Sequence, residues 1–241
     1  MMIDFHSHCL PGVDDGAANR DVSLQMLRES LQQGVTTVAA TPHFYPGEDE
    51  ITEFLQRRNE AARCLQSAID ADADLAGNVR LLLGAEVLVR EGVSRLDLRP
   101  LCIEGSDVVL LELPFASSPV WLYEEIENIV FEQGLRVMLA HVDRYMSWYS
   151  SERMSYLVDT PGLIVQLNGE NIVGRHSFRL LRRWLPQTDR LVLGSDMHNC
   201  EDRTQNRAAV CRRLRRSLTG RQWLATVEDT SCRLLEHILE G

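Results

Sequence analysis

The sequence contains no lysine, and all 25 of its basic residues are arginine. This absence excludes Schiff-base catalysis by a lysine, pyridoxal-phosphate attachment, the P-loop lysine and metal sites bridged by a carbamylated lysine. Positive charge is also scarce, because 35 acidic residues bring the net charge to -10. Proteins that bind nucleic acid in general are usually basic, so no nucleic-acid partner is expected. The basic run RRLRR at 212–216 lies beside Val210 and Leu214 at helical spacing, which indicates the exposed face of an amphipathic helix.

Long apolar runs are missing as well. No stretch approaches the roughly 20 apolar residues that cross a bilayer, so membrane insertion is not expected. The first ten residues, MMIDFHSHCL, show no basic segment followed by an apolar one, as a secretory signal would. The expected location is therefore the cytoplasm.

Paired cysteines are absent. None of the six cysteines forms a C-x-x-C pair, so a zinc ribbon or a thioredoxin-type motif is unsupported. None has an arginine six positions later, which excludes the C-x5-R loop of cysteine-dependent phosphatases. In a cytoplasmic chain a disulfide framework is not expected, and we interpret all six as buried or unreactive thiols.

Strand-like apolar runs alternate with helix-like segments along the whole chain. The expected strands cover residues 3–5, 35–41, 79–87, 107–113, 136–140, 163–167 and 190–195. The expected helices cover residues 21–33, 50–71, 119–133, 151–159 and 174–185, with two or three more in 204–239. Nearly continuous apolar strands indicate a parallel sheet that is covered on both faces. A single domain over residues 1–241 could then be a closed barrel or an open doubly wound sheet.

Histidine or acidic residues follow six of the seven expected strands, always at the same end. In a parallel βα barrel the carboxyl ends of the strands converge on one face, where active sites lie. We therefore favour a barrel of about seven parallel strands with a metal cluster at that face.

The spacing of these residues suits metal binding. His6 and His8 are two apart on a strand and point to the same side, and Asp196 and His198 repeat the spacing. Imidazoles and carboxylates without thiolates suit manganese, iron, zinc or cobalt. Each residue taken alone is more often a buried structural group. One ion takes about four to six ligands, so the candidates suggest two or three ions. The candidate ligands are His6, His8, Asp15, His43, Glu86, Glu112, His141, Asp196 and His198.

Two arginines and a set of aromatic residues suggest the substrate. Arg144 follows His141 by three residues, and Arg203 lies in the loop after the seventh strand. Guanidinium groups bind phosphate oxygens well, although either residue could also be a surface arginine. A group of aromatic residues could line a pocket for an aromatic ring or pack the loops: Phe44, Tyr45, Phe115, Trp121, Tyr145, Trp148 and Tyr149.

Several motifs, taken together, resemble the PHP (polymerase and histidinol phosphatase) superfamily: MIDFHSHCLPGVDDGA, ATPHFYPG, GAEV, LLELP, AHVDRY, QLNGENIVG and LGSDMHN. More narrowly, the chain is similar to the bacterial manganese-dependent protein-tyrosine phosphatases of capsule and exopolysaccharide operons. The resemblance implies a distorted TIM-like barrel with a trinuclear metal site. It also implies that the nine candidates are ligands, that Arg144 acts in catalysis, and that the substrate is phosphotyrosine on the tail of a bacterial tyrosine kinase.

The sequence departs from this family at two places. Asp143 stands in HVDRY where members often carry glutamate, and the last helix contains DTSCRLL where an Asn-Pro-type signal is common. Neither departure affects a candidate ligand. The expected chemistry is therefore unchanged. The departures leave open which protein partner the chain recognises.

The expected reaction is hydrolysis of a phosphomonoester. Divalent ions, manganese first, would lower the pKa of a water so that hydroxide attacks phosphorus, while Arg144 and Arg203 bind the phosphate. His198 or Asp143 could protonate the leaving oxygen. The alternatives are a small-molecule phosphatase of histidinol-phosphate type, a polymerase-associated nuclease, and a non-catalytic regulator that binds the kinase. The sequence gives no oligomeric state.

Overall fold

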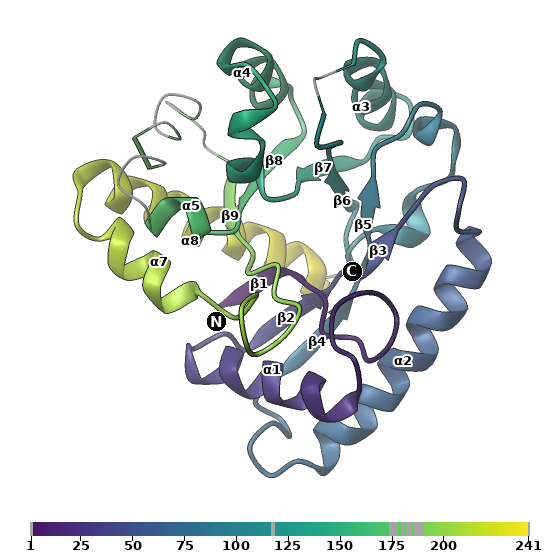
Figure 1. Ribbon diagram of the computed structural model, residues 1–241, viewed down its shortest axis with the longest axis vertical. Coiled ribbons are helices and arrows are strands. Elements are labelled where there is room, and N and C mark those ends of the chain that lie inside the picture. Colours follow the sequence, from purple (N-terminus) through teal and green to yellow (C-terminus); the bar gives the residue numbers. More distant parts are fainter. Residues whose placement is uncertain are drawn as a thin grey trace.

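The protein folds into parallel strands surrounded by helices, as a computed structural model shows for residues 2–116, 119–173, 178–179, 181, 185 and 190–240 (Figure 1). In that part of the chain every strand pair is parallel. The predicted parallel α/β class is therefore confirmed. The strands are β1 (Ile3–Ser7), β2 (Thr37–Ala40), β3 (His43–Phe44), β4 (Arg80–Leu83), β5 (Glu86–Leu88), β6 (Val108–Glu112), β7 (Arg136–Leu139), β8 (Leu163–Leu167) and β9 (Leu191–Leu193).

Apart from the short helix α5, which was not predicted, the described helices follow the predicted ranges to within a few residues. They are α1 (Arg20–Gln32), α2 (Ile51–Ala71), α3 (Trp121–Phe131), α4 (Ser151–Asp159), α5 (Glu170–Val173), α7 (Arg207–Leu214) and α8 (Leu218–Glu240). Short 3-10 turns lie at η1 (Val93–Arg95), η2 (Arg99–Leu101) and η3 (Val142–Ser147). Most of the helix expected at 174–185 falls outside the described residues. Among the described helices, none combines the length and the apolarity needed to cross a bilayer.

The third predicted strand is divided into β4 and β5, and a short strand that was not predicted, β3, follows the second one after Pro42, which gives two sheets instead of one. One sheet has the order β1-β2-β4 and the other the order β3-β5-β6-β7-β8-β9. Backbone hydrogen bonds continue between them, because Gly84 N–H donates to Ala40 O (2.9 Å) and Glu86 N–H donates to Pro42 O (3.0 Å). Pro42 has no N–H to offer its other neighbour, so the regular pairing is interrupted there. The two sheets thus form one continuous wall.

The segment after β9 returns to β1. Asp196 N–H donates to His6 O (2.8 Å), His8 N–H donates to Met197 O (2.9 Å), and Ser7 and Met197 form a parallel bridge. These contacts bring the two ends of the strand order together, as a barrel requires. The carboxyl ends of all the strands consequently surround one region.

A single apolar cluster fills the space inside this ring. It takes inward-facing residues from strands all around the ring, and Leu234, Leu235 and Ile238 of α8 complete it. Along β6 the alternate position after Leu110 is Glu112, and along β8 the one after Ile164 is Gln166. Side chains two apart on a strand share a face, so an apolar layer is followed by a polar layer at the carboxyl ends.

We expect Leu110→Ala, in the middle of the apolar layer, to lower the free energy of unfolding by about 2–5 kcal/mol, because it leaves a cavity among fully buried side chains. Urea unfolding followed by circular dichroism measures this change. The matched control is Leu218→Ala, whose side chain is 67% exposed, and which should change the value by less than about 0.5 kcal/mol. Equal effects of the two substitutions would contradict this description of the interior.

Candidate metal centre

Histidine and carboxylate side chains gather in three overlapping groups at the carboxyl ends of the strands. Within each group one possible ligand atom from every residue lies within 4.8 Å of the others. His8, His43 and Glu86 each belong to two groups, so the three groups form one continuous site. The groups are His8, Asp15, His43 and His198; His6, His8, Glu86 and Asp196; and His43, Glu86 and Glu112.

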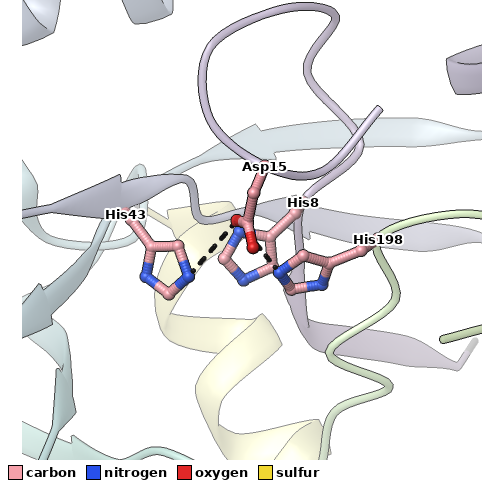
Figure 2. A group of neighbouring side chains, drawn as sticks. All are labelled: His8, Asp15, His43 and His198. Atoms are coloured by element: carbon pink, nitrogen blue, oxygen red, sulfur yellow. Dashed lines mark ion pairs between the residues drawn. The ribbon is translucent and has the colours of Figure 1, made fainter. Parts of the chain in front are cut away.

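Asp15 closes the outer side of the first group. Figure 2 shows its carboxylate extending from the loop after β1 toward the three imidazoles of this group. Its Oδ1 lies 3.6 Å from His43 Nε2 and 3.4 Å from His198 Nε2. The Asp15 side chain is 65% exposed whereas the His198 side chain is buried, so Asp15 lies at the mouth of the site.

Glu86 occupies the centre. Its Oε2 lies 3.1 Å from His6 Nε2, 3.2 Å from His8 Nε2 and 3.1 Å from His43 Nδ1. Burial raises the pKa of Glu86, but the charge and hydrogen bonds of His6, His141 and His8 outweigh it and hold that pKa well below the usual value. Glu86 is therefore a buried carboxylate anion facing several nitrogens, and a carboxylate in this position can bridge two ions.

The donor atoms fit a divalent cation. Four buried atoms that face this region, Glu86 Oε2, Asp196 Oδ1, His43 Nδ1 and His198 Nε2, make no hydrogen bond within the described part of the chain. Buried polar atoms are almost always satisfied, and each exception calls for an explanation. Oxygen and nitrogen lone pairs directed at one another are satisfied together by a metal ion.

His141 joins the site from the end of β7. Its Nε2 lies 2.9 Å from Glu86 Oε1 and 3.5 Å from Glu112 Oε1. Burial lowers the pKa of His141, but hydrogen bonds to Glu112 and Glu86 raise it to about 9. The carboxylates of Glu112 and Glu86 thus stabilise a positive charge beside them. A proton on His141 supplies that charge, and a bound metal cation would supply it too. The structure brings all nine candidate ligands into one site, and their role as ligands stays a prediction.

The backbone departs from regular geometry in β1, which carries His6 and His8, and at His141 and Asp196. Pairing of Asp4 with Val38 and of Ser7 with Ala40 leaves one extra residue in β1, which is a β-bulge. The bulge lets Phe5 contribute to the apolar layer while His6 and His8 point into the polar one. His141 and Asp196 have positive φ values of 31° and 54°, rare for residues other than glycine. Such strain is found at functional sites.

Asp14 is a functional residue that the sequence analysis did not select. Its Oδ2 lies 2.6 Å from His8 Nδ1 and accepts a hydrogen bond from His43 N–H (3.0 Å). Burial raises its pKa, but the hydrogen bond and charge of His8 lower it to about 2. A carboxylate behind a metal-binding imidazole fixes the orientation of the ring. The available signal was the second acidic residue next to Asp15, since both carboxylates contact candidate ligands.

Gln166 on β8 and Asn168 just after its end were missed too. Gln166 Oε1 accepts from His141 N–H (2.6 Å) and lies 3.1 Å from His6 Nδ1, which directs His6 Nε2 toward the site. Gln166 Nε2 donates to Asn168 Oδ1 (2.7 Å), and Asn168 Nδ2 donates to Asp196 Oδ2 (2.9 Å). Strand β8 carries no candidate ligand itself, but Gln166 and Asn168 thus hold His6, His141 and Asp196 in position. Its polar residues two apart, in LIVQLN, were the signal.

Arg144 and Arg203 meet at one carboxylate oxygen. Arg144 Nη1 donates to Asp196 Oδ2 (2.7 Å), and Arg203 Nη2 donates to the same oxygen (2.8 Å). Their side chains are 27% and 29% exposed, whereas the Asp196 side chain is buried. Two guanidinium groups from distant parts of the sequence therefore converge beside the ligand groups, with access to solvent.

The two candidate proton donors lie in different places. Asp143 is buried and its Oδ1 accepts a hydrogen bond from Asn168 N–H (2.9 Å), outside the three groups. His198 lies within the first group, and burial together with the positive charge of His8 lowers its pKa to about 4. Its imidazole is therefore neutral near pH 7 and able to bind a metal. A role of either residue in proton transfer stays a prediction.

The aromatic candidates divide into two sets. Phe115, which is 42% exposed, stacks on His141 with ring centroids 5.7 Å apart, and Tyr45 stacks on His43 at 5.3 Å. These two rings flank the site. Trp148 is half-exposed on the loop after β7. Phe44, Tyr145 and Tyr149 pack in the hydrophobic core, and the partly buried Trp121 packs against it.

The chain is similar to known proteins over most of its length. The family model described as capsular polysaccharide synthesis, CpsB/CapC, matches residues 2–230. Tyrosine-protein phosphatase CpsB of Streptococcus pneumoniae is 29% identical over 219 residues, which cover 84% of this chain and 85% of that protein. Tyrosine-protein phosphatase YwqE of Bacillus subtilis is 26% identical over 211 residues, 84% of this chain and 79% of that protein. The motif resemblance to the bacterial capsule phosphatases is therefore confirmed.

A solved structure shares the fold. It comes from a study of YwqE from Bacillus subtilis and CpsB from Streptococcus pneumoniae, described there as unique metal-dependent tyrosine phosphatases. The two chains superpose with a TM-score of 0.76 at 22% identity, over 98% of this chain and 95% of the other.

We expect Asp14→Asn to weaken metal binding about 10- to 100-fold, because the neutral amide no longer holds His8 in its charge-assisted contact. Isothermal titration with manganese measures the affinity. Asp21→Asn is the matched control, since the Asp21 side chain is 84% exposed, and it should bind as the unmodified protein does. An unchanged affinity in a folded Asp14→Asn protein would contradict the role given to Asp14.

Proposed function

The chain belongs to the CpsB/CapC family of capsular polysaccharide synthesis, and on this basis we propose that it is a metal-dependent protein-tyrosine phosphatase. The observation that carries the proposal is the convergence of nine histidine and carboxylate side chains with two guanidinium groups at one end of the strands. Cations and guanidinium groups are the two partners that a phosphate ester requires. The names of the curated relatives support the choice of phosphotyrosine.

The proposed cofactors are two or three divalent ions, with manganese first and iron, zinc or cobalt compatible with the same donors. The three overlapping groups would hold them, and Glu86 and His8 are shared between groups. When bound, such ions act as Lewis acids that lower the pKa of water to near neutrality and polarise phosphate oxygens.

The residues of the chain bind and orient the phosphate. Arg144 and Arg203 are held by Asp196 Oδ2, so their remaining N–H groups are positioned for phosphate oxygens. Phe115 and Tyr45 stand beside the site, where they can contact the tyrosine ring of the substrate. Proton delivery to the leaving oxygen is assigned to His198 or Asp143, although a phenolate leaves with less help than an alkoxide.

The proposed substrate is phosphotyrosine on the tail of a bacterial tyrosine kinase in capsular or exopolysaccharide biosynthesis. The proposed place of action is the cytoplasm, and a single domain over residues 1–241 stays part of the proposal. Purified protein should hydrolyse phosphotyrosine peptides faster than histidinol phosphate. Chelation should abolish turnover, and added manganese should restore it. Preference for histidinol phosphate would favour a small-molecule phosphatase, and no turnover with any metal would favour a non-catalytic regulator.

We expect Arg144→Ala to lower kcat/KM for a phosphotyrosine peptide by about a hundredfold or more. The reason is that hydrogen bonds to a charged group contribute about 1.5–3 kcal/mol each, and about 1.4 kcal/mol is a tenfold change in rate. Steady-state kinetics at fixed manganese measures the loss, and metal content checks that the site is intact. Arg63→Ala, on the exposed face of α2, is the control and should be unaffected. Near-normal turnover of a folded, metal-loaded Arg144→Ala protein would remove Arg144 from the mechanism.

Cysteine chemistry is not needed for the proposed reaction. All six cysteines are free, and burial raises the pKa of Cys9, the one beside His8, to about 12. The Cys9 thiol is therefore protonated at neutral pH and a poor nucleophile. We expect Cys9→Ser to keep turnover within about threefold of the unmodified enzyme, because serine has nearly the same size. A complete loss of activity with metal still bound would refute the proposed nucleophile.

A further inference from the structure

Positive charge is concentrated in one segment of this acidic chain. Residues 203–227 contain seven of the 25 arginines and no aspartate or glutamate, although the net charge of the whole chain is -10. Two of the seven are bound to the candidate metal site or to the strands: Arg203 binds Asp196, and the buried Arg207 donates from Nη1 to Ile3 O (3.2 Å). The other five form what we call the arginine patch: Arg212, Arg213, Arg215, Arg216 and Arg221.

The fold directs this patch outward. Helix α7 buries Arg207, Val210 and Leu214, so its other face meets solvent, as the sequence predicted. Arg212, Arg215, Arg216 and Arg221 are exposed. Arg221 Nη1 donates to Arg215 O (3.1 Å), which ties the start of α8 to the end of α7. In Figure 1, α7 lies on a different side of the molecule from α3 and α4.

Within the described part of the chain, the arginines of the patch are not paired with acids. Throughout the described residues, no ion pair includes any of its five arginines. Arg213 instead lies over the ring of Phe178, 4.4 Å from its centroid. The patch spans the end of α7, the turn after it and the start of α8. Basic residues clustered at a surface attract anionic lipid headgroups.

An exposed leucine lies within the patch. Leu218 stands between Arg216 and Arg221 in the sequence and is 67% exposed. An apolar side chain amid cationic ones suits a bilayer interface, where headgroup phosphates meet acyl chains. Single-stranded nucleic acid is a poorer match, because its bases stack on exposed aromatic rings and Trp223, the aromatic residue of this segment, is buried.

We propose that the arginine patch and Leu218 bind the surface of an anionic lipid bilayer, so that the protein attaches peripherally to membranes. Guanidinium groups contact lipid phosphates, and Leu218 enters the boundary between headgroups and acyl chains. This proposal does not depend on the phosphatase activity.

Sedimentation with lipid vesicles tests the proposal. The full chain should pellet with vesicles of phosphatidylglycerol and phosphatidylcholine at low salt, and stay in solution with phosphatidylcholine alone. Each arginine near an anionic surface strengthens binding about fivefold, so the triple variant Arg212→Gln/Arg215→Gln/Arg216→Gln should bind about a hundredfold more weakly. Leu218→Ser should weaken binding several-fold. The charge-matched control, Arg20→Gln/Arg63→Gln/Arg95→Gln, changes three exposed arginines elsewhere and should bind as the unmodified chain does.

Four results would overturn the proposal. In the first, the unmodified chain does not pellet with anionic vesicles, and in the second it pellets equally with neutral ones. In the third, the control variant loses as much vesicle binding as the triple variant. In the fourth, the chain binds a soluble polyanion such as heparin but not the vesicles. Turnover of p-nitrophenyl phosphate and the melting temperature should be unchanged in the triple variant, which confirms that it is folded. Vesicle binding without turnover would leave the membrane proposal standing and remove only the proposed phosphatase function.

Discussion

One buried carboxylate, that of Glu86, holds the site together. Moving an ionised group out of water is costly unless opposite charge or strong hydrogen-bond donors surround it. Three imidazole nitrogens lie 3.1–3.2 Å from its Oε2, and His141 lies 2.9 Å from its Oε1. Glu86 also belongs to two of the three ligand groups. The geometry of the whole centre therefore depends on a residue that stands at the beginning of β5, in the wall of the ring.

The fold supplies the dry environment that this arrangement requires. An apolar layer closed by the end of α8 lies below the polar layer and keeps water out from one side. Loops at the carboxyl ends, with Asp15 outermost, leave the other side accessible. Binding of metal ions would stabilise the folded chain, because the unfolded chain has no preformed site for them. Stability and function thus share the same residues, so substitutions in the polar layer should affect both.

Much of this arrangement could be predicted from the sequence. Polar residues at the ends of six apolar runs gave the ligand set, because parallel strands in a barrel align their carboxyl ends. The β-bulge in β1 could not be predicted, since it depends on pairing with β2, and neither could the positive φ of His141 and Asp196, which follows from tertiary contacts. Asp14, Gln166 and Asn168 were missed because they support ligands without belonging to the recognised spacing. The short strand β3, just after Pro42, was not predicted, because two residues are too few to give a hydropathy pattern.

Counting the bound ions tests whether Glu86, which two of the three candidate ligand groups share, is needed for the chain to hold more than one ion. Native mass spectrometry of manganese-loaded protein gives the number of ions per chain, for the unmodified chain and for Glu86→Gln. We expect two or three ions in the unmodified chain and at most one in Glu86→Gln. The glutamine side chain lacks the negative charge that two of the candidate ligand groups share. An unchanged number of ions in a folded Glu86→Gln protein would contradict this expectation.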